Sequence, residues 1–359
     1  MPKIGIGIVG CGDIARARYF PAIDSSPNFE LKGLYSRTSA SCEPLAKRYG
    51  GRIYGSLEDL LRAPDIEAVV IATPHPSHAE LSIQSLEAGK HVLTEKPMAT
   101  SFADARRLEA AAERSQRAFM ALPFDESPPV REAKRLIETG QIGRVSSADA
   151  VLAHRGPQHA PWFFDRDRAE WGVLADLGIY LISQLIYLLG PAERAFGRVS
   201  TVFPERVSRT GETFKVTVDD NVAAVIEWPD RTLATMRANW CSSSDHRNVI
   251  CETRIYGTKG IIFINPASKA NAIVAFSPEH AIEGATPIEY NGMTNCYRPA
   301  LGSWDGDQEI LRSLSKRIED SSVERNWTAS AARQRQVIEI IDKLYASSRE
   351  GSAMKLETN

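Results

Sequence analysis

Short apolar runs alternate with amphipathic stretches along the first 122 residues. Strands are predicted at 4–9, 29–35, 52–54, 66–72, 91–94 and 119–122. The amphipathic stretches predict helices at 15–23, 39–49, 57–61, 78–88 and 101–117. The run at 66–72 is almost continuously apolar, as expected of a parallel strand that is covered on both faces. Strands and helices that alternate this regularly predict a doubly wound parallel sheet.

The pattern changes after residue 122. An apolar helix is predicted from Asp176 to Leu189, where Gly190-Pro191 ends it. Alternating apolar and polar positions at 222–228, 233–240, 249–256 and 261–264 predict an antiparallel sheet with one exposed or partner-covered face. Residues 265–304 are predicted to form a long loop, either a lid or an oligomer contact. The acidic pair Asp219-Asp220 is predicted to form a turn.

The length and charge of the chain limit its organisation and its ligands. A chain of 359 residues is too long for one comfortable core. We therefore expect a dinucleotide-binding domain at 1–122 and a substrate-binding and oligomerisation domain at 123–359. The formal net charge of −2 provides no basic field for nucleic acid or an anionic membrane, so a small neutral or weakly charged ligand is expected.

Cysteine usage and hydropathy bear on the compartment. The five cysteines are scattered without a C-x-x-C pair, and the seven histidines are dispersed. This pattern indicates a reducing compartment and argues against a metal site. The apolar stretch after Lys3 is too short for a signal peptide, and we find no run near the roughly eighteen apolar residues of a membrane helix. A cytoplasmic protein is therefore expected.

A glycine-rich turn follows the first predicted strand with the spacing G-x-G-x-x-A. Gly10 would allow the tight turn, Gly12 would let the backbone approach a pyrophosphate, and Ala15 would keep helix and strand close. The N–H groups at the start of the helix would then face the phosphates. The candidate cofactor contacts in this turn are Gly10, Cys11, Gly12, Asp13 and Ile14.

The end of the second predicted strand bears on which dinucleotide binds. An NAD-specific site would usually offer a carboxylate to the ribose hydroxyls at this point. This chain has Ser36, Arg37 and Thr38 instead. A guanidinium and two hydroxyls match a 2′-phosphate, so NADP is favoured, although NAD stays possible if Arg37 is only a solvated loop residue.

Two more predicted strands end in polar residues, and charge at the carboxyl end of a buried strand usually serves a ligand. The stretch HVLTEKPMAT delivers a Glu-Lys-Pro step directly after the strand at 91–94. The candidate cofactor contacts at these two ends are Thr73, Pro74, His75, His78, Glu95, Lys96 and Pro97. His78 could equally be a residue at a helix start that packs against its neighbours.

The predicted helix at 176–189 has a polar face. In helical geometry Asp176 and Tyr180 share one side with Ser183, Gln184 and Tyr187, which suits a cleft. The alternative is that Asp176 is only an N-cap and Tyr180 an ordinary half-buried residue.

The motifs GIVGCGDIA, IATPHPSHAE and HVLTEKP together resemble the Gfo/Idh/MocA oxidoreductases. The resemblance continues at 140–143, 176–180 and 255–260, so it covers essentially the whole chain. It implies a Rossmann domain followed by an α+β domain with a large, open, mostly antiparallel sheet that often makes dimer or tetramer contacts. It also implies that Lys96 lies beside the nicotinamide and the reacting carbon, and that the Lys96–Pro97 bond is cis.

Tyr180 stands where many family members have His, and it resembles the glucose-fructose oxidoreductase and dimeric dihydrodiol dehydrogenase branches. A phenol with its ordinary pKa of about 10 exchanges protons poorly at neutral pH. A neighbouring ammonium lowers that pKa by favouring the phenolate. We therefore expect Lys96 and Tyr180 to act as an acid/base pair, with Asp176 orienting the substrate hydroxyl or the lysine.

Further substrate contacts are expected from the segment that resembles the family's substrate loop. His154, Arg155 and His159 lie in it, and Trp162 opens a stretch that departs from the family's usual glycine-rich lead-in to the helix at 176. The alternative is that these are exposed loop residues.

The leading hypothesis is an NAD(P)-dependent oxidoreductase that moves hydride between nicotinamide and a carbinol or ketone carbon of a sugar, cyclitol or related diol. One alternative is a dinucleotide-binding sensor without catalysis, and another is an NAD-dependent glycosidase on the same fold. The sequence favours catalysis because Lys96, Asp176 and Tyr180 occur together, but fold does not decide between the three. A homodimer or homotetramer is expected.

Overall fold

A computed structural model describes residues 2–123, 126–157, 160–242, 249–266, 268, 272–278, 280–302, 304–320 and 329–357. The chain forms two compact units, one of residues 1–124 with 304–338 and the other of 125–303 with 339–359. This division differs from the predicted consecutive domains, 1–122 and 123–359, because residues 304–338 return to the first unit.

The first unit contains a six-stranded sheet in the order β3-β2-β1-β4-β5-β6, and all of its neighbouring strands are parallel. This confirms the predicted doubly wound sheet. The strands are β1 (Ile4–Val9), β2 (Phe29–Tyr35), β3 (Arg52–Ile53), β4 (Ala68–Ile71), β5 (His91–Thr94) and β6 (Phe119–Ala121). The strand order reverses between β1 and β4, and ligands of such sheets bind at the carboxyl ends of the strands beside that point.

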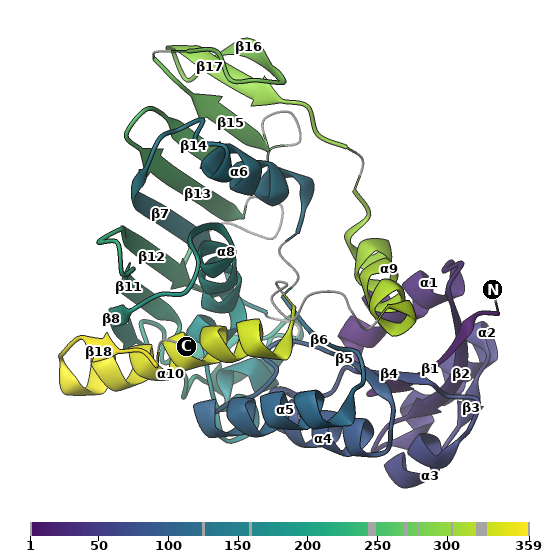
Figure 1. The fold of residues 1–359 in the computed structure, drawn as a ribbon. Helices are drawn as coiled ribbons and strands as arrows, with labels where there is room; N and C mark the ends of the chain where they lie inside the picture. The colour runs from purple at the N-terminus through teal and green to yellow at the C-terminus, as the bar shows by residue number, and fades with distance from the viewer. Residues whose placement is uncertain are drawn as a thin grey trace. The chain divides into compact units, whose positions relative to one another are not determined.

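Helical segments pack around the sheet of the first unit. They are η1 (Ala15–Tyr19), α1 (Phe20–Asp24), η2 (Ser39–Ser41), α2 (Glu43–Tyr49), α3 (Leu57–Arg62), η3 (His75–Ser77), α4 (His78–Glu87), α5 (Phe102–Ser115) and α9 (Gly306–Glu319). Ser101 caps α5, because its hydroxyl accepts a hydrogen bond from the backbone N–H of Asp104 at 3.1 Å. Figure 1 shows α4 and α5 side by side on this sheet.

The returning helix α9 explains why residues 304–338 belong to the first unit. The amide of Gln308 donates to the carbonyl of Ala22 at 2.9 Å, and the amide of Asn28 donates to the hydroxyl of Ser315 at 2.7 Å. These bonds hold α9 against α1 and the turn that follows it. The boundary with the second unit falls inside α10 (Ala331–Glu350).

The second unit contains a ten-stranded sheet in the order β16-β17-β15-β14-β13-β7-β12-β11-β8-β18. The β7–β12 pair is parallel and the other pairs are antiparallel, which confirms the predicted sheet. The strands are β7 (Val145–Ala153), β8 (Arg194–Ser200), β11 (Asn221–Glu227), β12 (Leu233–Asn239), β13 (Ile250–Gly257), β14 (Ile261–Ile264), β15 (Ile273–Phe276), β16 (Ala285–Tyr290), β17 (Met293–Pro299) and β18 (Met354–Lys355).

Helices α6 (Pro128–Glu138) and α8 (Ile179–Leu189) lie on one face of this sheet (Figure 1). Strand positions alternate between buried and exposed side chains, as in β12. The remaining elements are the hairpin β9 (Glu205–Val207) with β10 (Thr213–Lys215), and the short helical segments η4 (Pro161–Phe164), α7 (Arg166–Ala169) and η5 (Leu174–Gly178), the last a π-helical turn.

The prediction of a long loop at 265–304 is wrong, because β15, β16 and β17 lie within it. Pro287 interrupts the strand pattern of β16, but β16 is at the edge of the sheet, where proline is tolerated. The turn between β16 and β17 is made by Asn291 and Gly292, whose φ angles are 50° and 75°. Asn-Gly between two apolar runs is a strong hairpin signal, and it was available in the sequence.

The prediction that no run could span a membrane also needs correction. The helical stretch Arg166–Leu189 is long and apolar enough by composition, but 78% of its apolar window is buried inside the structure. A helix that packs in a protein core meets the same criterion, so this is weak evidence for a membrane span.

His91, at the start of β5, makes the stability of the first unit depend on pH. Its Nδ1 accepts a hydrogen bond from the backbone N–H of Ala118 at 2.9 Å, and burial lowers its pKa from 6.5 to about 4. The unfolded chain therefore binds this proton first as pH falls, so the stability contributed by neutral His91 is complete above about pH 6.5 and is lost toward pH 4.

We expect His91→Asn, which keeps an acceptor at the position of Nδ1 but does not titrate, to lose less stability than wild type between these pH values. Because the ring is only partly buried, the difference in the free energy of unfolding should be about 1–2 kcal/mol. Urea unfolding followed by circular dichroism at pH 7 and pH 4.5 measures it. Parallel pH curves for the two proteins would show that the prediction is wrong.

Candidate functional site

The glycine-rich turn has the geometry that a dinucleotide phosphate requires. Gly10 has φ of +101°, and a Cβ there would lie 2.5 Å from the carbonyl oxygen of Ala72, so only glycine fits. Gly12 is exposed, and a Cβ on it would meet nothing within 4 Å, so the turn is open on that side. Ala15 is fully buried at the start of η1. These features fit the pyrophosphate of a dinucleotide.

Two arginines, Arg16 and Arg37, lie near the phosphate turn and the end of β2. Arg37 and Thr38 are exposed and Ser36 is half-buried. Arg16 was not singled out in the sequence, yet its Nε donates to the carbonyl of Cys11 at 3.1 Å and its Nη2 to the carbonyl of Ser41 at 3.4 Å. The guanidinium of Arg16 therefore joins the phosphate turn to the segment after β2.

The Glu95 carboxylate connects the Glu-Lys-Pro step to the helix that follows the phosphate turn. It is buried and accepts hydrogen bonds from the hydroxyl of Tyr19 at 2.8 Å, from Nη1 of Arg18 at 3.1 Å and from the backbone N–H of Lys96 at 3.1 Å. Burial and the nearby carboxylate raise the pKa of Tyr19, so the phenol stays protonated and donates. The Lys96–Pro97 bond is cis, as the resemblance implied.

His78 connects the ends of β4 and β5. It is 1% exposed, its Nε2 lies 2.6 Å from the carbonyl oxygen of Thr73, and its Nδ1 lies 2.7 Å from that of Pro97. Burial lowers the pKa of His78, and the two carbonyls oppose this effect. These contacts favour the alternative in which His78 holds the two strand ends together. Among the other candidates at the β4 end, Pro74 is exposed and Thr73 half-buried, whereas His75 is buried.

In the second unit Asp176 and Tyr180 occupy the first turns of the predicted helix. Asp176 lies in η5 and is 9% exposed, and Tyr180 lies in α8 and is half-buried. The N-cap of η5 is Val173, so the alternative in which Asp176 only caps the helix is wrong. Farther along, Gln184 is buried and accepts a hydrogen bond from Thr253, so the polar face of the helix turns into the interior after its first turns.

Trp240 is a site residue that sequence reasoning missed. It is 1% exposed, and its indole N–H donates to Oδ2 of Asp176 at 3.2 Å. Its ring packs edge-on against Phe164, with 4.8 Å between ring centroids. A Cβ on Gly156 would lie 3.1 Å from the Trp240 ring, so the loop after β7 passes close to this indole. One buried aromatic residue thus contacts the segments of several candidate substrate residues.

The candidate substrate residues around that loop are placed as follows. His154 is half-buried, and its Nδ1 accepts from the backbone N–H of Gly156 at 2.8 Å. Arg155 is exposed, and Trp162 is half-buried against Phe163 with 4.1 Å between ring centroids. His159 lies outside the described residues.

The prediction of a turn at Asp219-Asp220 is wrong. Both residues are buried, Asp219 at 4% and Asp220 at 0% exposure, and they lie outside any turn, directly before β11. Sequence alone favoured a turn because an acidic pair is usually solvated. Within the described residues, no three or more His, Cys, Asp or Glu side chains are grouped as metal ligands.

The two halves of the predicted catalytic set belong to different units. Lys96 is in the first unit, and Asp176 and Tyr180 are in the second. The structure ties the backbone of Lys96 to Glu95, whose carboxylate also binds Arg18 and Tyr19 of η1, and it brings Asp176 together with Trp240. The pairing of Lys96 with Tyr180 stays a prediction.

Comparisons with known proteins find matches to both parts of the chain. Residues 4–122 match a family model described as an oxidoreductase family with an NAD-binding Rossmann fold, and residues 130–263 match a GFO/IDH/MocA C-terminal domain. The chain is 31% identical to trans-1,2-dihydrobenzene-1,2-diol dehydrogenase of Oryctolagus cuniculus, covering 88% of this chain and 91% of that protein. It is 27% identical to levoglucosan dehydrogenase of Pseudarthrobacter phenanthrenivorans, covering 87% and 88%.

A solved structure of levoglucosan dehydrogenase in complex with NADH has the same fold, with a TM-score of 0.84 over 100% of both chains at 23% identity. Because the family models together span most of the chain and a relative above 30% identity is covered almost completely, the chain belongs to the GFO/IDH/MocA family of oxidoreductases.

Proposed function

We propose that this protein is an NADP-preferring dehydrogenase or reductase that acts on a CH–OH group of a sugar, cyclitol or related diol. The observation that carries the proposal is the set of hydrogen bonds that hold Glu95. A buried carboxylate with three donors fixes the backbone of Lys96 at the carboxyl end of β5, where a doubly wound sheet binds its ligand. Relatives that act on levoglucosan and on a dihydrodiol support this substrate class.

Each catalytic residue has a proposed task. The nicotinamide, when bound, accepts or donates the hydride. Lys96 holds its ammonium at the substrate oxygen and favours the phenolate form of Tyr180, and Tyr180 takes the hydroxyl proton when the carbinol is oxidised. Asp176, fixed by the Trp240 indole, orients the same hydroxyl. In the reductive direction the proton moves back from Tyr180 to the carbonyl oxygen.

The preference for NADP rests on two guanidinium groups and two hydroxyls. Arg37, Ser36 and Thr38 follow β2, and Arg16 bridges to the same segment through the carbonyl of Ser41. Arginine with hydroxyl donors suits a phosphate dianion, whereas the ribose diol of NAD prefers a carboxylate that this segment lacks.

A screen of sugars, inositols and diols with NADP and with NAD tests the function. We expect the absorbance of reduced nicotinamide to rise with NADP and a polyol, and Arg37→Gln to raise the Kd for NADPH about tenfold with little effect on NADH. Fluorescence titration of the two reduced cofactors measures the Kd values. Turnover with NAD only would contradict the NADP assignment. Cofactor binding without turnover would favour a sensor, and turnover without net reduction of the nicotinamide would favour a glycosidase.

We also infer that a second copy of the chain covers the exposed face of the large sheet. Apolar side chains stand outward on four of its strands: Phe196, Val225, Leu233 and Ile250. Phe196 and Val225 are direct cross-strand neighbours, so they form a continuous apolar surface. Light scattering of the purified chain should give the mass of a dimer or tetramer, and a monomer mass at micromolar concentration would contradict this.

The cytoplasmic assignment rests on the cysteines. None of the five cysteines forms a disulfide within the described chain, although the sulfurs of Cys11 and Cys42 lie 3.1 Å apart. A cytoplasmic location is proposed because the cysteines are scattered without a C-x-x-C pair, as is usual in a reducing compartment.

A further inference from the structure

We propose that the buried Asp219-Asp220 step positions the two substrate-side segments of the second unit, which are the helix that begins with η5 and the loop that follows β7. This inference rests on the proposed function and assigns positioning roles to residues that lie outside the reacting groups. Two adjacent carboxylates buried this deeply are costly unless both are fully hydrogen-bonded, so their partners indicate what they are for.

Asp219 holds the start of the helix that carries Asp176 and Tyr180. Its Oδ1 accepts from the backbone N–H of Gly172 at 3.2 Å and its Oδ2 from that of Leu174 at 3.0 Å, while its carbonyl accepts from Val173 at 2.9 Å. The first N–H groups of a helix lack partners within the helix, and a carboxylate there also interacts favourably with the helix dipole.

The contact is close enough to require glycine on the helix side. A Cβ on Gly172 would lie 2.1 Å from the carbonyl oxygen of Asp219. One residue therefore fixes where the helix begins, and with it the direction in which the side chains of the first turns point.

Tyr345 of α10 completes this branch. Its hydroxyl donates to Oδ1 of Asp219 at 2.6 Å and lies 3.3 Å from the backbone nitrogen of Gly172, from which it accepts. The Tyr345 ring stacks on Trp171, with 5.9 Å between ring centroids. Burial raises the pKa of both Asp219 and Tyr345, so the phenol stays protonated and donates.

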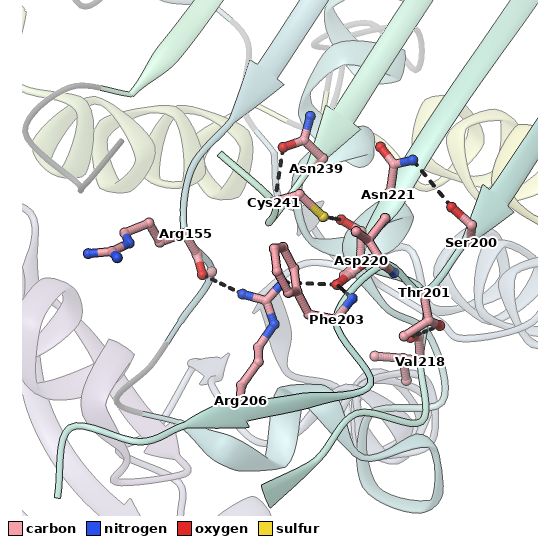
Figure 2. Close-up of polar contacts among 12 residues, drawn as sticks. Arg155, Ser200, Thr201, Phe203, Arg206, Val218, Asp220, Asn221, Asn239 and Cys241 are labelled. Atoms are coloured by element: carbon pink, nitrogen blue, oxygen red, sulfur yellow. Dashed lines mark hydrogen bonds and ion pairs between the residues drawn. The ribbon is translucent and has the colours of Figure 1, made fainter. Parts of the chain in front are cut away.

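Asp220 holds the loop after β7 through Arg206 (Figure 2). Its two carboxylate oxygens accept from the backbone N–H of Val202 at 2.7 Å and of Phe203 at 3.0 Å, and Nη2 of Arg206 donates to Oδ2 at 2.9 Å. Nη1 of Arg206 donates to the carbonyl of Arg155 at 2.9 Å. In Figure 2 the Arg155 side chain extends away from Arg206, so the contact fixes the loop backbone and leaves that side chain available.

Trp240 joins the two branches. Its backbone N–H donates to the carbonyl of Asp220 at 2.8 Å, and its indole N–H donates to Asp176 at 3.2 Å. Two consecutive residues thus hold both substrate-side segments. Asp219 holds the start of the helix, and Asp220 holds the loop after β7 and the backbone of Trp240.

Tyr345→Phe and Arg206→Lys test the two branches separately. Tyr345→Phe removes one hydroxyl. We expect faster amide hydrogen exchange in peptides covering 172–180 and a kcat about tenfold lower, with an unchanged Kd for the cofactor. Arg206→Lys keeps the charge but cannot hold both partners. We expect a KM for the substrate about tenfold higher, with kcat nearly unchanged.

Ser347→Ala is the matched control on the same helix, α10. The buried Ser347 hydroxyl accepts from the backbone N–H of Gly197 at 3.1 Å and donates to the carbonyl of Ser352 at 2.7 Å, so the same kind of network is lost away from η5. We expect wild-type kcat and wild-type exchange at 172–180 for this variant.

Unchanged exchange at 172–180 in a folded Tyr345→Phe protein, together with a wild-type kcat, would overturn the inference, as would equal losses in Ser347→Ala. A fall in kcat alone, without a change in exchange, would also count against it. If wild type turns over none of the sugars or diols, the proposed function fails, and the exchange result alone decides whether this step holds the helix.

Discussion

We expect Lys96→Met to lower kcat at least ~10²-fold, equivalent to about 2.7 kcal/mol of barrier, while the Kd for the reduced cofactor stays close to that of wild type. Methionine keeps an unbranched apolar stem like that of lysine but lacks the ammonium, so the backbone hydrogen bond from Lys96 to Glu95 should persist. What is lost is the ammonium that, in the proposed function, stabilises the developing charge on the substrate oxygen and the phenolate. Stopped-flow absorbance of the nicotinamide with a saturating substrate measures the effect.

Lys90→Met is the control for this experiment. Lys90 is buried, whereas Lys96 is half-buried, and the Lys90 ammonium donates to the backbone carbonyls of Ala63 and Ile66, at 2.9 and 2.6 Å, just before β5. We expect this variant to lose stability while the folded protein keeps its kcat. If Lys96→Met retained turnover within about tenfold of wild type, its role as an acid/base partner would be refuted.

Tyr180→Phe should have the next largest effect, a fall in kcat of ~10²-fold, because phenylalanine keeps the ring of the half-buried side chain but cannot exchange a proton. The KM for the substrate should change much less. The rate of wild type should rise with pH in the oxidative direction as the phenol ionises, and Tyr180→Phe should lose that dependence.

Tyr187→Phe, two turns farther along α8, is the matched control, and we expect wild-type rates from it. A pH–rate profile of the same shape in wild type and Tyr180→Phe would assign the titrating proton to another group. Equal losses in the two phenylalanine variants would instead indicate damage to the helix.

The first unit could be predicted almost completely from local patterns. All six of its strands lie within the predicted ranges, and the cap at Ser101 and the Gly10 turn depend on neighbours in sequence. The return of α9 could not be predicted, because it depends on contacts such as that of Asn28 with Ser315, 287 residues apart.

The residues of the candidate site also fall into those that could be predicted from sequence and those that could not. Lys96, Asp176 and Tyr180 could be named because they follow motifs. Trp240 and the pair Asp219-Asp220 could not, because nothing near them in sequence shows that tertiary contacts bury them. An isolated acidic pair reads as a solvated turn unless its distant donors are known.

The central claim is that hydride passes directly between a carbinol carbon and the nicotinamide. The most direct test uses a turned-over polyol that carries deuterium on the reacting carbon, with the products analysed by mass spectrometry. The proposed function predicts deuterium on the reduced nicotinamide and equal amounts of ketone and reduced cofactor. Deuterium released to water, or product formed without accumulation of reduced nicotinamide, would contradict it.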